Sequence, residues 1–335
     1  MYKFAQMTSE DRDFVFSKTA IEKGIRKEII EKDFWVCLML DYLFTKSRFK
    51  KDLTFKGGTS LSKGFDIINR FSEDIDLILN WTTLGVGILE PLEQRSNTKQ
   101  DLFNKGLNLK AEEFIKNELL LDIKQNLSKL LNIEIDISVD ENESQVINFH
   151  YPKVYVTDDD YIKQYVRLEI GPLAAWSPSL EIDIKPYACE SMPSAFELNS
   201  TKVLTVAPER TFWEKATILH REANRPEDKT MPARYARHYY DIYKFSKTKY
   251  FISALREREL LNKVVEFKNK FYRDNWAKYE DCLKYELKLV PPLFRKKEIE
   301  KDYNQMKDMF YGDVPTFEEI LTQLKIVENL INDKN

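Results

Sequence analysis

The stretch 55-FKGGTSLSKGF-65, followed closely by 70-RFSEDIDLIL-79, decides the fold that we expect for this chain. Its pattern predicts a strand, a glycine turn, a short helix and a second strand. The glycines allow a close backbone approach where a Cβ atom would collide, and Thr59 is expected to cap the helix. Backbone N–H groups of a turn that leads into a helix point outward and attract an anion. The candidate phosphate site is therefore formed by Gly57, Gly58, Thr59 and Ser60.

The second strand carries a pair of carboxylates. Its period of two puts Asp74 and Asp76 on one face, opposite the apolar residues of the strand. Side chains two residues apart on a strand are separated by about 6.5–7 Å, so hard cations such as Mg²⁺ can be held between the carboxylates. Metal ions held there would bind the triphosphate of a nucleotide. The alternative is a strand–helix–strand unit with surface acids.

The order of these motifs resembles the polymerase-β-type nucleotidyltransferase superfamily, which has Gly-Gly-Thr-Ser before a helix and an Asp-x-Asp strand after it. More narrowly, 56-KGGTSLSK-63 with 70-RFSEDID-76 resembles the AbiEii/AbiGii toxin family of bacterial abortive-infection and toxin–antitoxin systems. One departure is the fifteen residues that separate Gly58 from Asp74, which is more than the general superfamily pattern allows. We therefore expect a longer or irregular helix between them.

The resemblance implies nucleotidyl transfer at a two-metal Mg²⁺ site. The superfamily completes this site with a third carboxylate on a neighbouring strand, which also helps to deprotonate the attacking hydroxyl. Glu169 in 165-YVRLEI-170 is the preferred third carboxylate, and Asp183, which also alternates with apolar residues, is the rival. The expected metal ligands are thus Asp74, Asp76 and Glu169.

Composition favours a folded chain with room for two domains. Hydrophobic residues make up 43% and aromatic residues 13% of its 335 residues, which excludes a disordered protein. The net charge is only −3, so any contact with RNA must be a local patch. Cys37, Cys189 and Cys282 lack metal-site spacing and are expected to be reduced and mostly buried. Without a secretory signal or an apolar run of ~20 residues, the protein is expected to be cytoplasmic and to have no membrane partner.

Two helices are expected before the glycine turn. The first begins after Thr8 and ends near Gly24. The second covers about residues 27–44, and its apolar residues spread over more than one stripe, which predicts packing on two sides. It contains 31-EKDFW-35, which also resembles a motif of the toxin family. We favour an interpretation in which its aromatic residues are core and its charged residues are solvated, over a catalytic role.

The centre of the chain alternates between the two periodicities. A helical pattern covers about residues 101–131, with a break expected near Gly106. A period of two then predicts two antiparallel strands over residues 133–149, joined by a polar turn. The acidic run Asp158–Asp160 is expected to be a solvated turn rather than a metal site.

The second half changes character. Residues 157–200 hold eight acids and three bases, whereas residues 202–250 hold six acids and eleven bases. The helix expected from Pro208 places Lys215 on an apolar face, where burial of its charge requires an anion. Its string 210-RTFWEK-215 resembles the second motif of the toxin family, in which the lysine contacts the nucleotide. Lys215 is therefore a candidate catalytic and nucleotide-binding residue, and snorkelling to solvent is the alternative.

A further motif lies in 234-RYARHYYDIYK-244. One helical face is expected to carry Arg234, Arg237, His238 and Asp241. Arg237 and Asp241 have the i, i+4 spacing at which they can form an ion pair. The string resembles the last motif of the family, whose basic residue, tyrosines and aspartate line the active-site cleft. This implies that Arg237 binds a phosphate and that Asp241 orients Lys215 or accepts a proton; a surface salt bridge is the alternative.

These patterns together predict a bilobal α+β protein. Residues 1–203 are expected to form a nucleotidyltransferase domain, a small mixed sheet flanked by helices. Residues 204–335 are expected to form a largely helical domain that contributes to the active-site cleft. The candidate catalytic residues are Asp74, Asp76, Glu169, Lys215 and Asp241.

The resemblance implies a toxin that is neutralised by a separate antitoxin. Such a toxin transfers a nucleoside monophosphate from a nucleoside triphosphate to an acceptor, which in such families is RNA, notably the 3′ end of tRNA. The alternatives are a small-molecule adenylyltransferase of the antibiotic-modifying kind and a non-catalytic nucleotide- or RNA-binding module on the same scaffold.

Overall fold

A computed structural model describes residues 1–156 and 163–333 of the chain. The chain divides into two compact units. The first comprises Met1–Gly64 and Phe71–Val206, and the second comprises Phe65–Arg70 and Ala207–Asn335. The acidic run Asp158–Asp160 lies outside the described residues. That residues 1–203 and 204–335 are separate domains stays a prediction.

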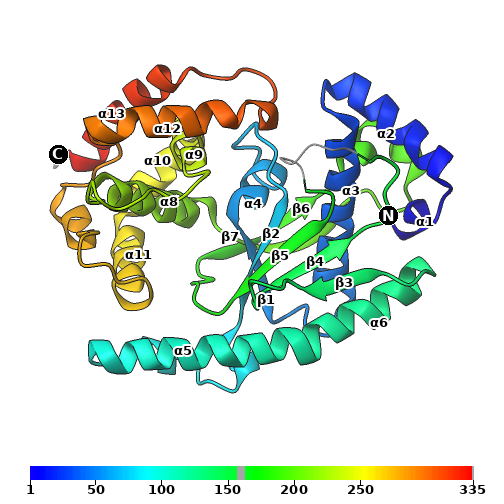
Figure 1. Cartoon of the computed structure of the whole chain (residues 1–335), viewed down its shortest axis with the longest axis horizontal. Coiled ribbons are helices and arrows are strands. Elements are labelled where there is room, and N and C mark those ends of the chain that lie inside the picture. The colour runs from blue at the N-terminus through cyan, green and yellow to red at the C-terminus, as the bar shows by residue number, and fades with distance from the viewer. Residues whose placement is uncertain (157–162, 334–335) are drawn as a thin grey trace. The chain divides into compact units, whose positions relative to one another are not determined.

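The first unit is built on a seven-stranded sheet with the order β3-β4-β5-β2-β1-β7-β6 (Figure 1). The strands are β1 Leu53–Lys56, β2 Asp74–Leu79, β3 Asp136–Val139, β4 Val146–His150, β5 Val166–Gly171, β6 Ser179–Ile184 and β7 Thr201–Val206. Strand β2 lies at the centre, antiparallel to β1 and parallel to β5. The sheet is therefore mixed, as the sequence predicts. The two strands expected over residues 133–149 are β3 and β4, and their antiparallel pairing confirms that prediction.

Helices flank this sheet. They are α1 Tyr2–Ala5, α2 Ser9–Lys23, α3 Lys27–Asp41, α4 Gly57–Lys63, α5 Asn97–Phe114, α6 Leu120–Leu131 and α7 Tyr187–Ser191. Helix α2 begins after Thr8, whose side chain accepts a hydrogen bond from Asp11 N, and ends at Gly24 in the left-handed conformation, as expected. Helix α3 packs against β2, β5 and β7. All its residues from 29 to 41 are buried, which confirms that it packs on more than one side.

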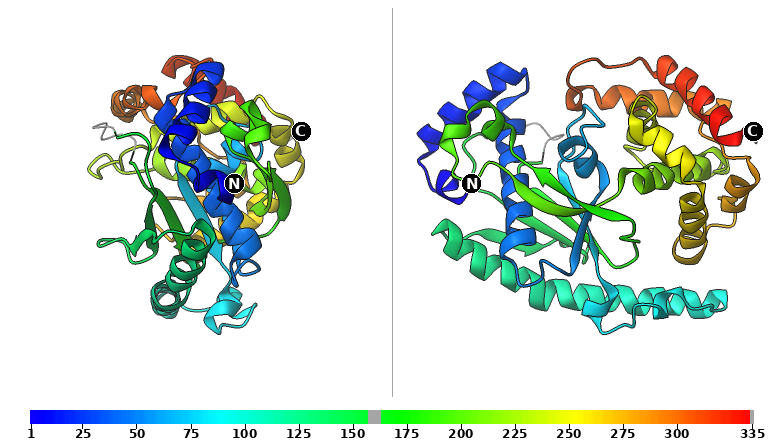
Figure 2. Two further views of the ribbon diagram at one scale, coloured as in Figure 1. Left: turned by 90° about the vertical axis from the view of Figure 1, so that its right-hand side faces the viewer. Right: turned by 180° about the vertical axis from the view of Figure 1, so that it is seen from behind.

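Two expectations about helices in the first unit are wrong. Helix α5 runs through Gly106 without a break, because an isolated glycine in a helix costs only about 1 kcal/mol. A π-helical turn, Ile115–Leu119, instead joins α5 to α6, and together they form one long continuous helix (Figure 2). Helix α4 has only seven residues, so the extra residues before Asp74 do not lengthen it. They form a non-helical segment, of which Phe65–Arg70 belongs to the second unit.

The second unit is largely helical. Its helices are α8 Pro208–Ala223, α9 Ala236–Phe245, α10 Lys249–Arg256, α11 Arg258–Phe271, α12 Leu293–Gln305 and α13 Phe317–Asn332. Pro208 occupies the start of α8, as expected from its preset φ and missing N–H.

Burial agrees with the expectation for the cysteines. All three cysteines are free and buried. Among the described residues, no helix combines the length and apolar character that crossing a bilayer requires.

Candidate active site

Three carboxylates gather on one face of the central strands. Asp74 and Asp76 are half-buried on β2, whereas Ile75 and Leu77 on the opposite face are fully buried. The parallel pairing of β2 with β5 places Glu169 beside Asp76. Neighbouring strands lie about 4.7–4.9 Å apart, so paired residues on one face can act on the same ligand.

Asp183 has a different position. It lies on the edge strand β6, with β7 and β1 between it and β2. Its exposed carboxylate forms an ion pair with Lys202 at 3.1 Å. The Glu169 carboxylate is held by Arg167, whose Nε donates to Glu169 Oε1 at 2.9 Å. Of the two candidate third carboxylates, the sheet register therefore brings only Glu169 to Asp76.

The electrostatics of this face suit a cation. Burial, and then the charges of Glu73, Glu169 and Asp76, raise the pKa of Asp74 to about 7. A divalent cation would remove this repulsion, and carboxylate oxygens are the ligands that Mg²⁺ prefers. Within residues 1–156 and 163–333, no group of three or more His, Cys, Asp or Glu side chains is arranged so that it could hold a metal ion. The carboxylates of this face have the donor atoms that Mg²⁺ prefers, but a metal ion bound there would need further ligands from substrate or water.

The glycine turn lies directly against this carboxylate face. Gly57 has a left-handed φ of +84°, and a Cβ atom at this position would lie 1.8 Å from Asp76 Oδ2. The register of the two strands explains the contact, because Lys56 at the end of β1 pairs with Asp76. The sequence thus correctly predicts a close approach at Gly57, and the group that approaches is Asp76.

The hydroxyl groups of the turn act differently from the expectation. Lys56, not Thr59, occupies the N-cap position of α4, so the predicted cap is wrong. Thr59 lies inside the helix, fully buried, and its hydroxyl donates to Asp74 O at 2.6 Å and to Ser72 O at 3.0 Å. Ser60 Oγ donates to Gly57 O at 2.8 Å. Thr59 thereby ties the helix to the carboxylate strand, because it reaches the backbone of Asp74 itself.

A basic cluster forms in the second unit around Asp241. This carboxylate is fully buried and lies 2.7 Å from Lys215 Nζ. Arg70 donates to its two oxygens at 2.8 and 2.9 Å. Burial alone would raise the pKa of Asp241, but Arg70 and Lys215 outweigh burial and lower it. Burial, partly offset by Asp241 and reinforced by Arg70, lowers the pKa of Lys215. Two cations therefore share one carboxylate in a buried place.

The predicted arrangement of α9 is partly wrong. Arg234 precedes the helix, with a φ of +61°, so it does not share the face of Asp241. Arg237 does not form the i, i+4 ion pair that its spacing allows, because Asp241 is taken by Arg70 and Lys215. The half-buried Arg237 has no ion-pair partner among the described residues.

Arg70 is the residue of this cluster for which the sequence predicts no role. It stands at the start of the string 70-RFSEDID-76, but its partner Asp241 is 171 positions away. Nothing local indicates that contact.

The expectation for the charged residues of 31-EKDFW-35 is also wrong. They are expected to be solvated, but Glu31, Lys32 and Asp33 are buried.

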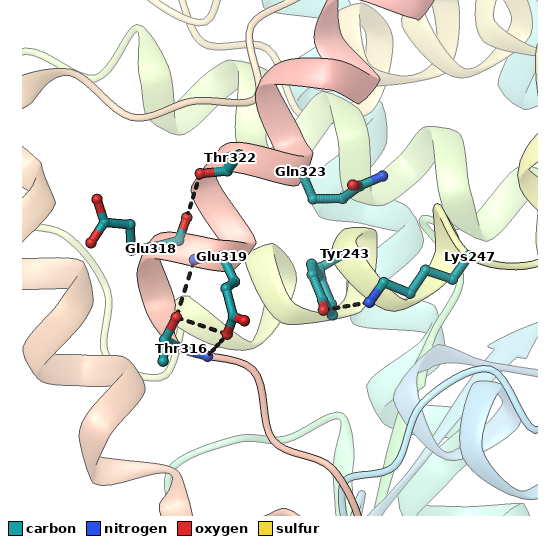
Figure 3. A pocket seen from close by; sticks show the side chains of 7 residues that line it. All are labelled: Tyr243, Lys247, Thr316, Glu318, Glu319, Thr322 and Gln323. Carbon is teal, nitrogen blue, oxygen red and sulfur yellow. Dashed lines mark hydrogen bonds between the residues drawn. The ribbon is translucent and has the colours of Figure 1, made fainter.

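A pocket of about 460 Å³ lies elsewhere in the second unit, between α9 and the start of α13 (Figure 3). Some of its polar groups bind one another. Thr316 and Glu319 form a capping box, and Lys247 donates to the hydroxyl of Tyr243. None of the site residues predicted from the sequence lines this pocket.

Comparisons with known proteins agree with the resemblance. Residues 39–323 match the model of the family described as nucleotidyl transferase AbiEii toxin, type IV TA system. The fold is similar to that of MenT4, a nucleotidyltransferase toxin from Mycobacterium tuberculosis H37Rv, with a TM-score of 0.52 and 16% sequence identity. That similarity covers 97% of this chain and 90% of MenT4. No curated protein matches the chain. Because the family model covers most of its length, the chain belongs to the AbiEii family of nucleotidyltransferase toxins from type IV toxin–antitoxin systems.

Proposed function

We propose that this nucleotidyltransferase transfers a nucleoside monophosphate from a nucleoside triphosphate to a hydroxyl of RNA, notably at the 3′ end of tRNA, and releases pyrophosphate. One observation carries the proposal. The turn at Gly57 lies against Asp76, which has Glu169 beside it in the sheet. A phosphate-binding turn next to a carboxylate face is what a metal-dependent transfer of a phosphate group needs.

The carboxylates of the first unit would hold the metal. Asp74, Asp76 and Glu169 supply hard oxygen ligands, and their mutual repulsion supports the binding of a cation. Bound there, two Mg²⁺ ions would neutralise phosphate charge and lower the pKa of the attacking hydroxyl. Glu169, oriented by Arg167, would accept the proton of that hydroxyl. The backbone of residues Gly57, Gly58, Thr59 and Ser60 would bind the phosphates.

The cations of the second unit would bind the triphosphate charge. Lys215 and Arg70 share a single carboxylate, so their cluster carries an excess positive charge in a buried place. Arg237, which has no carboxylate partner among the described residues, adds a planar donor group suited to phosphate. Asp241 would keep Lys215 protonated and oriented. An anionic substrate would offset the electrostatic cost of this cluster.

Family membership implies a nucleoside triphosphate as substrate and an antitoxin as partner. The RNA acceptor is our proposal. The experiment below distinguishes transfer to RNA from transfer to a small-molecule acceptor and from nucleotide binding without transfer.

The test is transfer of label from each of four α-labelled nucleoside triphosphates to total cellular RNA with Mg²⁺. The wild type is compared with Asp76→Asn and with Asp183→Asn as the control on the edge strand. Label on one RNA class, absent with Asp76→Asn and retained with Asp183→Asn, supports the proposal. No label on RNA, but label on an aminoglycoside-type acceptor, would replace RNA with a small molecule. Tight binding of triphosphate without any transfer would favour a sensor.

A further inference from the structure

Three successive charged residues near the start of α3 are buried. Glu31, Lys32 and Asp33 are 0%, 1% and 2% exposed. Side chains at successive helix positions point about 100° apart, so each of the three reaches a different segment of the first unit. Burial of a charge is costly without a partner, and each has one.

Lys32 holds the start of the carboxylate strand. Its Nζ lies 2.5 Å from Glu73 Oε2, and both side chains are buried. It also donates to Lys163 O at 2.6 Å, just before β5, the strand that carries Glu169. Glu73 immediately precedes Asp74 in the sequence. Lys32 therefore fixes the backbone from which the first candidate metal ligand projects.

Asp33 holds the end of the glycine helix. Its Oδ1 lies 2.8 Å from Nζ of Lys63, the last residue of α4, and both side chains are buried. Its other oxygen accepts a hydrogen bond from Tyr187 N at 2.7 Å. The Lys63 ammonium also lies 3.4 Å from the ring centre of Tyr187. Asp33 therefore fixes the helix whose first residue is Gly57.

We propose that Lys32 and Asp33 are positioning residues that set the spacing between the carboxylate strand and the glycine turn. The inference rests on the proposed function of these two segments. Helix α3 is buried on all sides, so neighbouring positions on it are rigidly related. Through Glu73 and Lys63 it holds β2 and α4 in register, so that Asp76 can lie against Gly57.

The two anchors predict separate kinetic effects. Lys32→Met should raise the Mg²⁺ concentration for half-maximal transfer by about tenfold, because the segment that precedes Asp74 loses its anchor and Asp74 is no longer held in place. It should leave KM for the nucleotide at saturating Mg²⁺ within about twofold, since α4 keeps its anchor. Asp33→Asn should raise KM for the nucleotide by about tenfold and leave the Mg²⁺ dependence nearly unchanged.

Paired substitutions guard against simple misfolding. Lys32→Met combined with Glu73→Gln, and Asp33→Asn combined with Lys63→Met, leave no unpaired buried charge. Each double variant should fold better than its parent single variant and yet keep the same kinetic defect, because the anchor is still missing. Glu31→Gln is the matched control. Glu31 is equally buried on α3, but it accepts hydrogen bonds from Val154 N and Tyr155 N rather than holding β2 or α4.

Amide hydrogen exchange gives a readout that does not need transfer activity. Loss of Lys32 should speed exchange in residues 73–76, and loss of Asp33 should speed it in residues 57–64. If the wild type transfers no nucleotide, the proposed function fails, while exchange and Mg²⁺–ATP binding still decide whether the anchors act separately. Identical defects in both variants, or the same defects with Glu31→Gln, would overturn the inference.

Discussion

The carboxylate of Asp76 lies so close to the α-carbon of Gly57 that a methyl group there would be 1.8 Å from Asp76 Oδ2. The contact joins the glycine turn of residues 55–65 to the carboxylate strand of residues 70–79. It also means that residue 57 must be glycine for two reasons, its left-handed φ of +84° and the space that Asp76 occupies.

Gly57→Ala is therefore expected to abolish nucleotidyl transfer. The added methyl group displaces Asp76, a candidate metal ligand, and the left-handed backbone costs a further 1–2 kcal/mol or so. The matched control is Gly85→Ala, whose φ is +68° but whose Cβ would meet nothing within 4 Å. Thermal unfolding should show destabilisation in both variants, and only Gly57→Ala should lose activity. Equal activity in the two would show that the contact with Asp76 has no role in catalysis.

Glu169→Gln is expected to lower kcat by about 100-fold or more. The substitution removes the negative charge beside Asp76 that would hold the metal and accept the proton of the attacking hydroxyl. Asp183→Asn should stay within about twofold of the wild type, since its exposed partner is Lys202 and surface ion pairs contribute little. Single-turnover kinetics at saturating nucleotide measures both. A larger effect of Asp183→Asn than of Glu169→Gln would exchange their roles.

Asp74→Asn is expected to stabilise the metal-free protein while it removes activity. The folded-state pKa of Asp74 is raised to about 7, above the unfolded value of about 3.9, so the ionised carboxylate destabilises the fold at neutral and higher pH. The gain should be about 4 kcal/mol at pH 8 and should shrink as the pH falls from 7 toward 4, because Asp74 of the folded wild type is protonated over this range.

The measurement is urea unfolding in EDTA across this pH range. Added Mg²⁺ should then stabilise the wild type but not Asp74→Asn, because the cation relieves a repulsion that the variant lacks. A variant that is less stable than the wild type at pH 8 would contradict the electrostatic account of this face.

Asp241→Asn and Lys215→Met should separate stability from activity in the second unit. Loss of Asp241 leaves Arg70 and Lys215 buried without their carboxylate and should cost about 3–5 kcal/mol. Loss of Lys215 leaves Arg70 paired with Asp241, so it should change stability by less than about 1 kcal/mol. Transfer should nevertheless fall by about 100-fold with Lys215→Met if its charge binds the triphosphate.

Glu222→Gln is the control for that pair of variants. It breaks the buried ion pair between Glu222, on the same helix as Lys215, and Arg225, which follows that helix, and it should destabilise the protein without lowering kcat. Urea unfolding and kcat are measured on all three. If Lys215→Met keeps full activity, Lys215 has no role in binding the triphosphate.

The central part of the fold could be predicted from sequence because its signals are local. These signals all lie within the 25 residues 55–79. They are the glycines of the turn, the period of two in β2 and the apolar face of that strand. The rest depends on partners that are remote in the chain. Arg237 and Asp241 have the i, i+4 spacing of a local ion pair. Asp241 instead accepts a bidentate contact from Arg70 and forms an ion pair with Lys215, and neither partner lies near it in the sequence.

The buried charges of α3 were missed for a related reason. Lysine and aspartate are usually solvated, so Lys32 and Asp33 were expected at the surface. Their partners Glu73 and Lys63 lie 41 and 30 residues further along the chain, and a helical pattern shows which residues share a face but not what covers it. A motif of consecutive charges inside an otherwise apolar helix is the signal that could have indicated burial.

One labelling experiment follows both ends of the nucleotide at once. Wild-type protein and Asp76→Asn are incubated with RNA, Mg²⁺ and a nucleoside triphosphate that is labelled at either the α- or the γ-phosphate. We predict that α-label enters RNA while γ-label appears in pyrophosphate in equal amount, and that both signals vanish with Asp76→Asn. Entry of γ-label into the acceptor, or α-label transfer that survives in folded Asp76→Asn, would contradict this prediction.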